Sequence, residues 1–103
     1  MIDWLTLPPP TALRAFAAFA ETGSVISAGT ALNVSHAAIS QQLRALETHM
    51  GVALVDRSGR AMALTVEGRQ LASALRTGVG AIAASVEALR GADAARPARR
   101  RSR

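Results

Sequence analysis

Residues 23–51, GSVISAGTALNVSHAAISQQLRALETHMG, predict two helices joined by a short corner. A serine precedes each predicted helix, at Ser24 and Ser35, and a serine oxygen in that position can accept a hydrogen bond from a free backbone N–H. Apolar residues recur near helical spacing on one face of the pair, at Ala28, Ala31, Leu32, Ala38, Ile39, Leu43 and Leu46. Polar residues of the second helix lie outside that face, at Ser35, His36, Ser40, Gln41 and Arg44. An exposed polar row near the start of a second helix is typical of a DNA recognition helix.

An earlier helix is predicted over residues 11–22, with Thr11 as its cap and Gly23 at its end. The prolines at residues 8–10 favour an extended chain before it. Half of the residues are hydrophobic, but many of these are alanine, so large core side chains are few. Trp4, Phe16 and Phe19 are expected among them. Gly29 is expected to permit a close approach between the two helices of residues 24–50.

The segment VALVDRSGRAMALT, residues 52–65, predicts a strand, a turn and a second strand. Such a hairpin after a recognition helix would form a wing. Arg57 and Arg60 flank its turn, where an arginine can reach a phosphate backbone or the minor groove. For Arg57 a structural role, bound to Asp56 or to the end of the preceding helix, is equally open.

A last long helix is predicted over about residues 66–90, with Thr65 as its cap and Glu67 in its first turn. Its apolar residues form a seam close to a heptad repeat, at Leu71, Leu75, Val79, Ile82, Val86 and Leu89. Nothing else in the chain is available to cover the end of this seam. The seam therefore predicts a partner helix, most simply the same helix of a second copy, although Gly78 and Gly80 weaken its middle.

Composition and charge restrict the function classes. A chain of 103 residues predicts one domain, and the absence of cysteine excludes disulfides and thiol chemistry. Residues 1–89 carry six arginines and six acids, so the net charge of +5 comes from residues 90–103. No secretory signal, membrane span, catalytic constellation or metal-binding spacing is visible, and His36 and His49 are too far apart on one helix to share a metal. We expect a cytoplasmic protein that is not an enzyme and has no cofactor.

The order of these motifs resembles the N-terminal DNA-binding domain of LysR-type transcriptional regulators. The resemblance rests on residues 28–32, 34–35, 38–43, 46–47, 51, 54, 56–57, 60, 64–65 and 68. It implies a mainly α fold, a winged helix-turn-helix with a three-helix core and a short β-hairpin over residues 1–65. A linker and dimerisation helix would follow over residues 66–91. Residues 92–103 are expected to be a disordered, arginine-rich tail, which is either an additional phosphate contact or a solvated end.

The resemblance also implies site residues. The family's base and backbone contacts fall on His36, Ala37, Ser40 and Gln41, where the family commonly has Gln-Pro at the first two positions. The half-site preference is therefore open, and His36 is alternatively a solvated residue. Arg44 would contact a phosphate or pair with Glu47, and Arg60 is the favoured wing contact. Ser27 stands where relatives often carry a basic or larger polar residue.

The implied function is sequence-specific binding of double-stranded DNA by a transcription regulator that forms a homodimer through residues 66–91. The family's small-molecule effector domain is not expected in this chain. An alternative is a truncated partner that pairs with a full-length regulator through the linker helix and modulates its assembly. Another bacterial regulator family with a winged fold is a third possibility.

Overall fold

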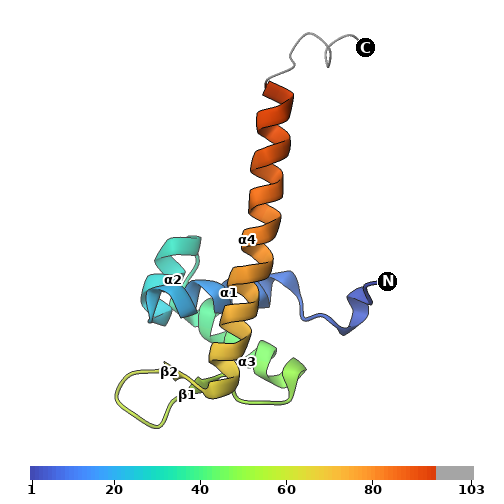
Figure 1. Ribbon diagram of the computed structural model, residues 1–103. Helices are drawn as coiled ribbons and strands as arrows, with labels where there is room; N and C mark the ends of the chain where they lie inside the picture. Colours follow the sequence, from blue (N-terminus) through green and yellow to red (C-terminus); the bar gives the residue numbers. More distant parts are fainter. Residues whose placement is uncertain (95–103) are drawn as a thin grey trace.

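The structure, a computed structural model, describes the backbone of residues 1–94 and the side chains of residues 1–91. Three helices, α1 (Pro10–Thr22), α2 (Val25–Leu32) and α3 (His36–Met50), form a compact body. A hairpin of β1 (Val55–Asp56) and β2 (Ala63–Leu64) follows, and α4 (Val66–Ala94) projects from the body as a long rod (Figure 1). A short 3-10 turn, η1 (Trp4–Thr6), precedes α1. The predicted mainly helical, winged fold is confirmed. The predicted tail of residues 92–103 begins too early, because the helix continues to Ala94, and residues 95–103 lie outside the described residues.

Three of the four predicted helix caps are confirmed. The side-chain oxygens of Ser24, Ser35 and Thr65 accept hydrogen bonds from the amides of residues 27, 38 and 68, at 3.0, 3.1 and 2.9 Å. The prediction for Thr11 is wrong, because α1 begins at Pro10 without a side-chain cap. A proline in the first turn of a helix has no backbone N–H. One fewer N–H group therefore needs a hydrogen bond from a capping side chain.

The corner between α2 and α3 is close because Gly29 has no side chain. A Cβ at Gly29 would lie 2.7 Å from the carbonyl oxygen of Val34, so the predicted close approach is confirmed. Asn33 closes α2 in the left-handed conformation, with φ of 59°. An asparagine tolerates this conformation better than most residues, and the chain can turn directly into α3.

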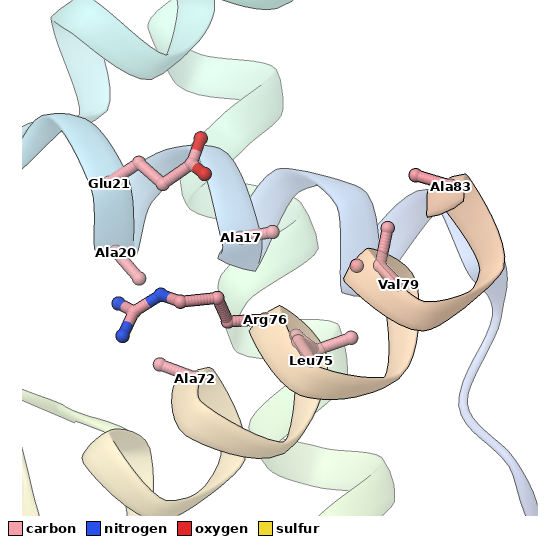
Figure 2. Close-up of a pocket in the computed structure, with 9 residues that line it drawn as sticks. Ala17, Ala20, Glu21, Ala72, Leu75, Arg76, Val79 and Ala83 are labelled. Carbon is pink, nitrogen blue, oxygen red and sulfur yellow. The ribbon is translucent and has the colours of Figure 1, made fainter. Parts of the chain in front are cut away.

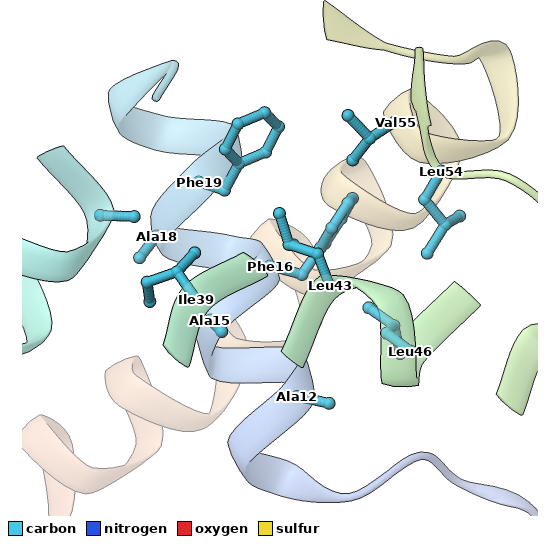
Figure 3. Packing of buried hydrophobic residues seen from close by; sticks show 11 residues of the cluster. Ala12, Ala15, Phe16, Ala18, Phe19, Ile39, Leu43, Leu46, Leu54 and Val55 are labelled. Carbon is cyan, nitrogen blue, oxygen red and sulfur yellow. The ribbon is translucent and has the colours of Figure 1, made fainter. Parts of the chain in front are cut away.

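The core lies between α1, α3 and the first strand (Figure 3). Alanines on the buried face of α1 let the helices approach closely, and the core's largest side chains are Phe16, Phe19, Ile39, Leu43, Leu46 and Leu54. The prediction for Trp4 is wrong, since its side chain lies in η1, outside the body, and is 72% exposed. Ala31, expected on the apolar face of α2, is also exposed.

The hairpin is shorter than the sequence pattern predicts. Its two strands pair antiparallel over two residues each, with Val55 opposite Leu64 and Asp56 opposite Ala63. Val52 lies outside the strand and is 41% exposed. The wing is therefore mainly a loop over residues 57–62, held at its base by a minimal ladder.

Helix α4 packs on the body only through its first turns. Gly68 is buried, and a Cβ there would collide with the carbonyl oxygen of Leu54. Leu71, Ala72 and Leu75 are partly buried against the core. From Val79 onwards the apolar side chains of α4 are exposed.

Candidate nucleic-acid interface

The exposed face of α3 carries the residues that the sequence predicts for DNA contact. His36, Ala37, Gln41 and Arg44 are exposed and Ser40 is partly exposed, while Ile39, Leu43 and Leu46 turn inward. Helical periodicity places the five outward residues on one side of the helix, within its first two and a half turns. Ser35, the cap, lies at the entrance to this face and its hydroxyl is already bonded to the amide of Ala38. The described geometry thus brings the α3 residues together on one accessible surface.

Glu47 ties the end of α3 to the base of the wing. One carboxylate oxygen accepts hydrogen bonds from the amides of Leu54 and Val55, at 2.8 and 3.0 Å. The guanidinium of Arg57 donates to both carboxylate oxygens, at 3.1 and 3.3 Å. Partial burial alone would raise the pKa of Glu47, but these hydrogen bonds and the charge of Arg57 together lower it. The carboxylate is therefore ionised at neutral pH and holds the hairpin against the end of α3.

In this structure Arg57 makes one of the structural contacts that the sequence leaves open, and its contact with DNA stays a prediction. Its guanidinium is bound to the end of α3, one of the two structural alternatives, and its side chain is 30% exposed. The Asp56 carboxylate instead accepts hydrogen bonds from the amide and hydroxyl of Ser58, which lower its pKa. Arg57 is consequently a support of the wing in this geometry, rather than a free cation at its tip.

The side chain of Arg44 does not pair with Glu47. Among the residues whose side chains the structure describes, Arg57–Glu47 is the one ion pair within 4.0 Å. Arg44 lines a shallow depression between the end of α3 and the start of the hairpin, together with Thr48, Gly51 and Arg57. It is therefore an exposed cation between the start of α3 and the wing.

Arg60 lies in the wing loop and is exposed. Its neighbours Gly59 and Ala61 are also exposed, so the tip of the loop has no bulky side chain beside the arginine. The loop starts at the Asp56–Ser58 turn, where the hydroxyl-to-carboxylate distance is 2.6 Å. Arg44 and Arg60 thus provide the two exposed cations of the predicted site, one on the helix and one on the wing.

Sequence reasoning missed the role of Glu47. The sequence places Glu47 next to a buried leucine and suggests Arg44, three residues before it, as its partner. The actual partners are backbone amides seven and eight residues later, which no side-chain pattern reveals. One feature of the sequence could have indicated this role. Glu47 lies at the border of the buried face of α3, shortly before Gly51, where the chain turns back into the hairpin.

The predicted dimerisation residues divide into two groups. Leu71 and Leu75 are partly covered by the body. Val79, Ile82, Val86 and Leu89 are exposed by 56, 65, 41 and 71%. The second group forms a strip of apolar side chains that are mainly exposed, with Val79 and Ile82 at the edge of a groove toward the segment before α1.

Within residues 1–94, no helix combines the length and the apolar character needed to span a membrane. The side chains that the structure describes also form no cluster of three or more His, Asp or Glu residues able to hold a metal ion.

Comparison with protein families gives a match over the body and the wing. The model for bacterial regulatory helix-turn-helix proteins of the lysR family matches residues 10–69. The AhcY transcriptional activator HvrB of Rhodobacter capsulatus is 51% identical over 89 residues, which cover 86% of this chain and 30% of that protein. A probable hydrogen peroxide-inducible genes activator of Mycobacterium xenopi is 44% identical over 92 residues, covering 89% of this chain and 49% of the relative. The chain thus spans half or less of the length of these relatives.

Solved structures show the same arrangement of helices and wing. The chain is similar to the CbnR DNA-binding domain in its complex with DNA, with 34% identity and a TM-score of 0.68, covering 80% of this chain and 94% of that one. The BenM DNA-binding domain on the catB site 1 DNA has 25% identity and a TM-score of 0.71, covering 78% and 89%. A mutant of OxyR from Corynebacterium glutamicum has 33% identity and a TM-score of 0.72, covering 84% of this chain and 28% of that one.

Proposed function

The chain belongs to the LysR family of bacterial regulatory helix-turn-helix proteins and carries that family's DNA-binding domain, and on this premise we propose that it binds a specific sequence of double-stranded DNA as a homodimer. Helix α3 enters the major groove, the wing contacts the adjacent backbone or minor groove, and α4 joins two copies. Two copies related by a two-fold axis would recognise a pseudo-palindromic site.

The observation that carries the proposal is the exposed face of α3. Its polar groups differ in the targets they can reach: an amide such as Gln41 can make two hydrogen bonds to adenine, while a short hydroxyl such as Ser40 can bond a base or a phosphate. His36 can donate to a guanine acceptor or a phosphate. The one acid within α3, Glu47, is already bound to Arg57 and to two amides, so its negative charge is partly compensated.

The comparisons support the same assignment. The solved structures of the CbnR and BenM DNA-binding domains are complexes with DNA, and most of each is matched by this chain. The body of this chain is neutral overall, so affinity must come from locally placed cations rather than from net charge. Arg44 and Arg60 are the exposed arginines that face the proposed DNA side.

The proposed dimer rests on the uncovered part of the α4 seam. Four large apolar side chains repeat at helical spacing over residues 79–89 and are 41–71% exposed. Continuous apolar surface of this kind is typical of an interaction site. We assign residues 66–91 to the dimer contact and residues 1–65 to the DNA-binding unit.

The experiment is selection of bound sequences from a random duplex library at two salt concentrations, with the full chain and with a version ending at Gly91. Enrichment of a two-fold-symmetric motif by both versions is the expected result. Salt-sensitive binding without a motif, dependent on residues 92–103, would contradict the proposal. That outcome would favour the alternative in which the chain acts as a partner of a longer regulator through α4.

A pair of arginine variants sharpens this test. Arg60→Ala is expected to weaken binding to the selected motif about tenfold and to reduce the salt dependence by about one counterion, since it removes one phosphate contact. Arg90→Ala is the matched control, because Arg90 is exposed in the last turns of α4, and the far end of this helix lies away from α3 and the wing (Figure 1). Equal losses from both variants would show that the arginines act only through general charge.

A sequence-reading variant separates specificity from affinity. Gln41→Ala is expected to relax the preference at one position of each half-site by about 1–3 kcal/mol, with little change in binding to random duplex. An unchanged motif would exclude Gln41 from base recognition.

A further inference from the structure

The segment before α1 presents a second apolar surface to solvent. In this segment, which we call the N-terminal turn (residues 1–9), Ile2, Trp4, Leu5 and Leu7 are exposed by 62, 72, 92 and 44%. An exposed tryptophan next to an almost fully exposed leucine is unusual, because large apolar side chains gain free energy when water is excluded from them. Trp4 is also the only tryptophan in the chain.

The N-terminal turn is a folded element with defined contacts. The Asp3 carboxylate accepts a hydrogen bond from the amide of Leu5 at 3.0 Å, and the Thr6 hydroxyl donates to the Asp3 carbonyl at 2.9 Å. His49, at the end of α3, is placed to donate from Nε2 to the carbonyl oxygen of Thr6 at 3.2 Å. The turn is thereby attached to the body, and its apolar side chains are held in an outward position.

A groove connects the N-terminal turn to the seam of α4. It has a volume of about 400 Å³, and its lining includes Leu7 and Pro8 of the turn, Met50 of α3, and Leu75, Val79 and Ile82 of the seam. Leu7 and Pro8 therefore link the turn to the surface that we assign to the dimer, and Trp4 and Leu5 precede them in the chain. A second groove lies on the other side of the contact between α1 and α4 and carries Glu21 and Arg76 at its edge (Figure 2).

The size of the seam indicates that α4 alone is a small interface. Four exposed aliphatic side chains on a single helix offer a few hundred Å² per copy, whereas specific dimers bury about 800 Å² per partner. A tryptophan contributes as much as about 150–250 Å² by itself. The side chains of the N-terminal turn, added to the groove and the seam, bring the surface into the range of a stable dimer.

The charges of α4 favour an antiparallel arrangement of two copies. Arg69, Arg76, Glu87 and Arg90 lie on one flank of the helix. The other flank carries Glu67 in the first, docked turn and is uncharged over residues 74–85, at Ala74, Gly78, Ala81 and Ser85. When two identical helices run antiparallel, equivalent flanks face each other, so Arg76 of each copy lies opposite Glu87 of the other. In a parallel pair Glu87 would face the uncharged flank.

The antiparallel arrangement of the two α4 helices also determines which part of the second copy lies next to the N-terminal turn. The turn lies beside the uncharged flank, because Ala74 and Gly78 line the groove together with residues of the turn. An antiparallel partner brings the far part of its own uncharged flank to this place. Small residues there leave room for an indole ring between the larger side chains of Ile82 and Leu89.

We propose that the N-terminal turn is a second dimerisation element, which packs through Trp4 and Leu5 on the Ile82–Leu89 part of α4 in a second copy of this chain. The inference rests on the proposed dimer and extends it to residues outside the matched family region of residues 10–69. Each copy would contribute one turn and one helix end, so the contact is made twice.

The fluorescence of Trp4 reports directly on whether its side chain is buried in the dimer. The chain has no tyrosine and no other tryptophan, so its near-ultraviolet emission comes from Trp4. The full chain is diluted over a wide concentration range while sedimentation gives its mass and fluorescence gives the emission maximum and iodide quenching. The expected result is a blue shift and protection from iodide that follow the monomer-to-dimer transition.

The outcomes separate this inference from the proposed function. A doubling of mass while Trp4 keeps the emission and quenching of a water-exposed indole would overturn the inference and leave the α4 dimer intact. A chain that remains monomeric at every concentration would remove the dimer and the inference together.

Two variants of exposed residues complete the test. Trp4→Ala is expected to raise the dimer dissociation constant about tenfold, as loss of an aromatic anchor does, with unchanged circular dichroism. Ile26→Ala is the matched control, because Ile26 is 65% exposed on α2, away from the groove, and should change the constant less than about twofold. Equal constants for the Trp4 variant and the unmodified chain would contradict the proposal.

Discussion

The two halves of α4 carry the same apolar repeat but have different surroundings. In the first half, Leu71 and Leu75 are partly buried against the core, and Gly68 lies against the backbone of Leu54. In the second half, Val79, Ile82, Val86 and Leu89 lie outside the core and are 41–71% exposed, and only Val79 and Ile82 border a groove shared with the body. The repeat therefore determines which face of the helix is apolar, whereas the body determines how far that face is covered. Substitutions in the first half of α4 should accordingly change the free energy of unfolding, and substitutions in the second half should change the dissociation constant of the dimer.

The largest expected effect is that of Gly68→Ala. A methyl group at this position collides with the main-chain carbonyl of Leu54, and neither backbone can move without separating α4 from the hairpin. We expect a loss of about 3 kcal/mol in the free energy of unfolding, as in overpacked cores. Urea unfolding at a concentration where the chain is monomeric measures it. A loss below about 1 kcal/mol would show that the first half of α4 is not tightly docked.

The second test compares two variants of α4, each of which replaces one leucine, in the first or in the second half of the helix. Leu75→Ala should cost about 2 kcal/mol of unfolding free energy, because its side chain packs against the core. Leu89→Ala should change the same quantity by less than about 0.5 kcal/mol in the monomer, since its side chain is 71% exposed. The order is expected to reverse for dimer dissociation, measured by sedimentation. Similar unfolding losses from both variants would contradict the division of the helix.

A third test concerns Glu47, which holds the hairpin on which the first half of α4 packs. Glu47→Gln weakens the hydrogen bonds to the amides of Leu54 and Val55 and removes the charge that binds Arg57, so we expect a loss of about 1–2 kcal/mol at pH 7. Because folding lowers the pKa of Glu47, its contribution is present above the unfolded value of about 4.3 and is lost as the pH falls through the lower folded value.

The difference between the Glu47→Gln variant and the unmodified chain should therefore shrink below about pH 4. Glu87→Gln, in the exposed half of α4, is the control for the pH profile of the monomer. A difference that is constant from pH 7 to pH 3 would show that Glu47 does not act through its charge.

The smallest expected effect is an increase in the free energy of unfolding. Gly80→Ala adds a methyl group where no atom outside the local helix lies within 4 Å, so it should favour the helix by about 0.5–1 kcal/mol. Circular dichroism and urea unfolding of the monomer measure the change. Destabilisation by Gly80→Ala would mean that this part of α4 is packed more closely than the structure shows.

Local chemistry explains what the sequence predicts well. Ser24, Ser35 and Thr65 cap helices through atoms only three residues away, and the buried faces of α1 and α3 follow from helical spacing. The polar face of α3 follows from the same spacing. These features depend on neighbours in the sequence and need no knowledge of the tertiary structure.

The features that the sequence did not predict depend on distant parts of the chain. Trp4 is as hydrophobic as any core residue, but η1 leaves it outside the body. Arg57 had three candidate contacts, namely DNA, Asp56 and the end of the preceding helix, and the return of the hairpin to the end of α3 brings it to Glu47. Whether the side chains on α3 and the wing bind DNA as proposed stays a prediction.

The length of α4 has a mechanical consequence. Its 29 residues extend about 43 Å, but only the first turns hold it to the body. The helix is thus a lever: tilting it by about ten degrees at its docked end moves the far end by about 7 Å, or about two base-pair steps of 3.4 Å. In a dimer joined through these helices, the contact between Gly68 and Leu54 would set the distance between the two recognition helices, and with it the spacing of half-sites that the pair can reach.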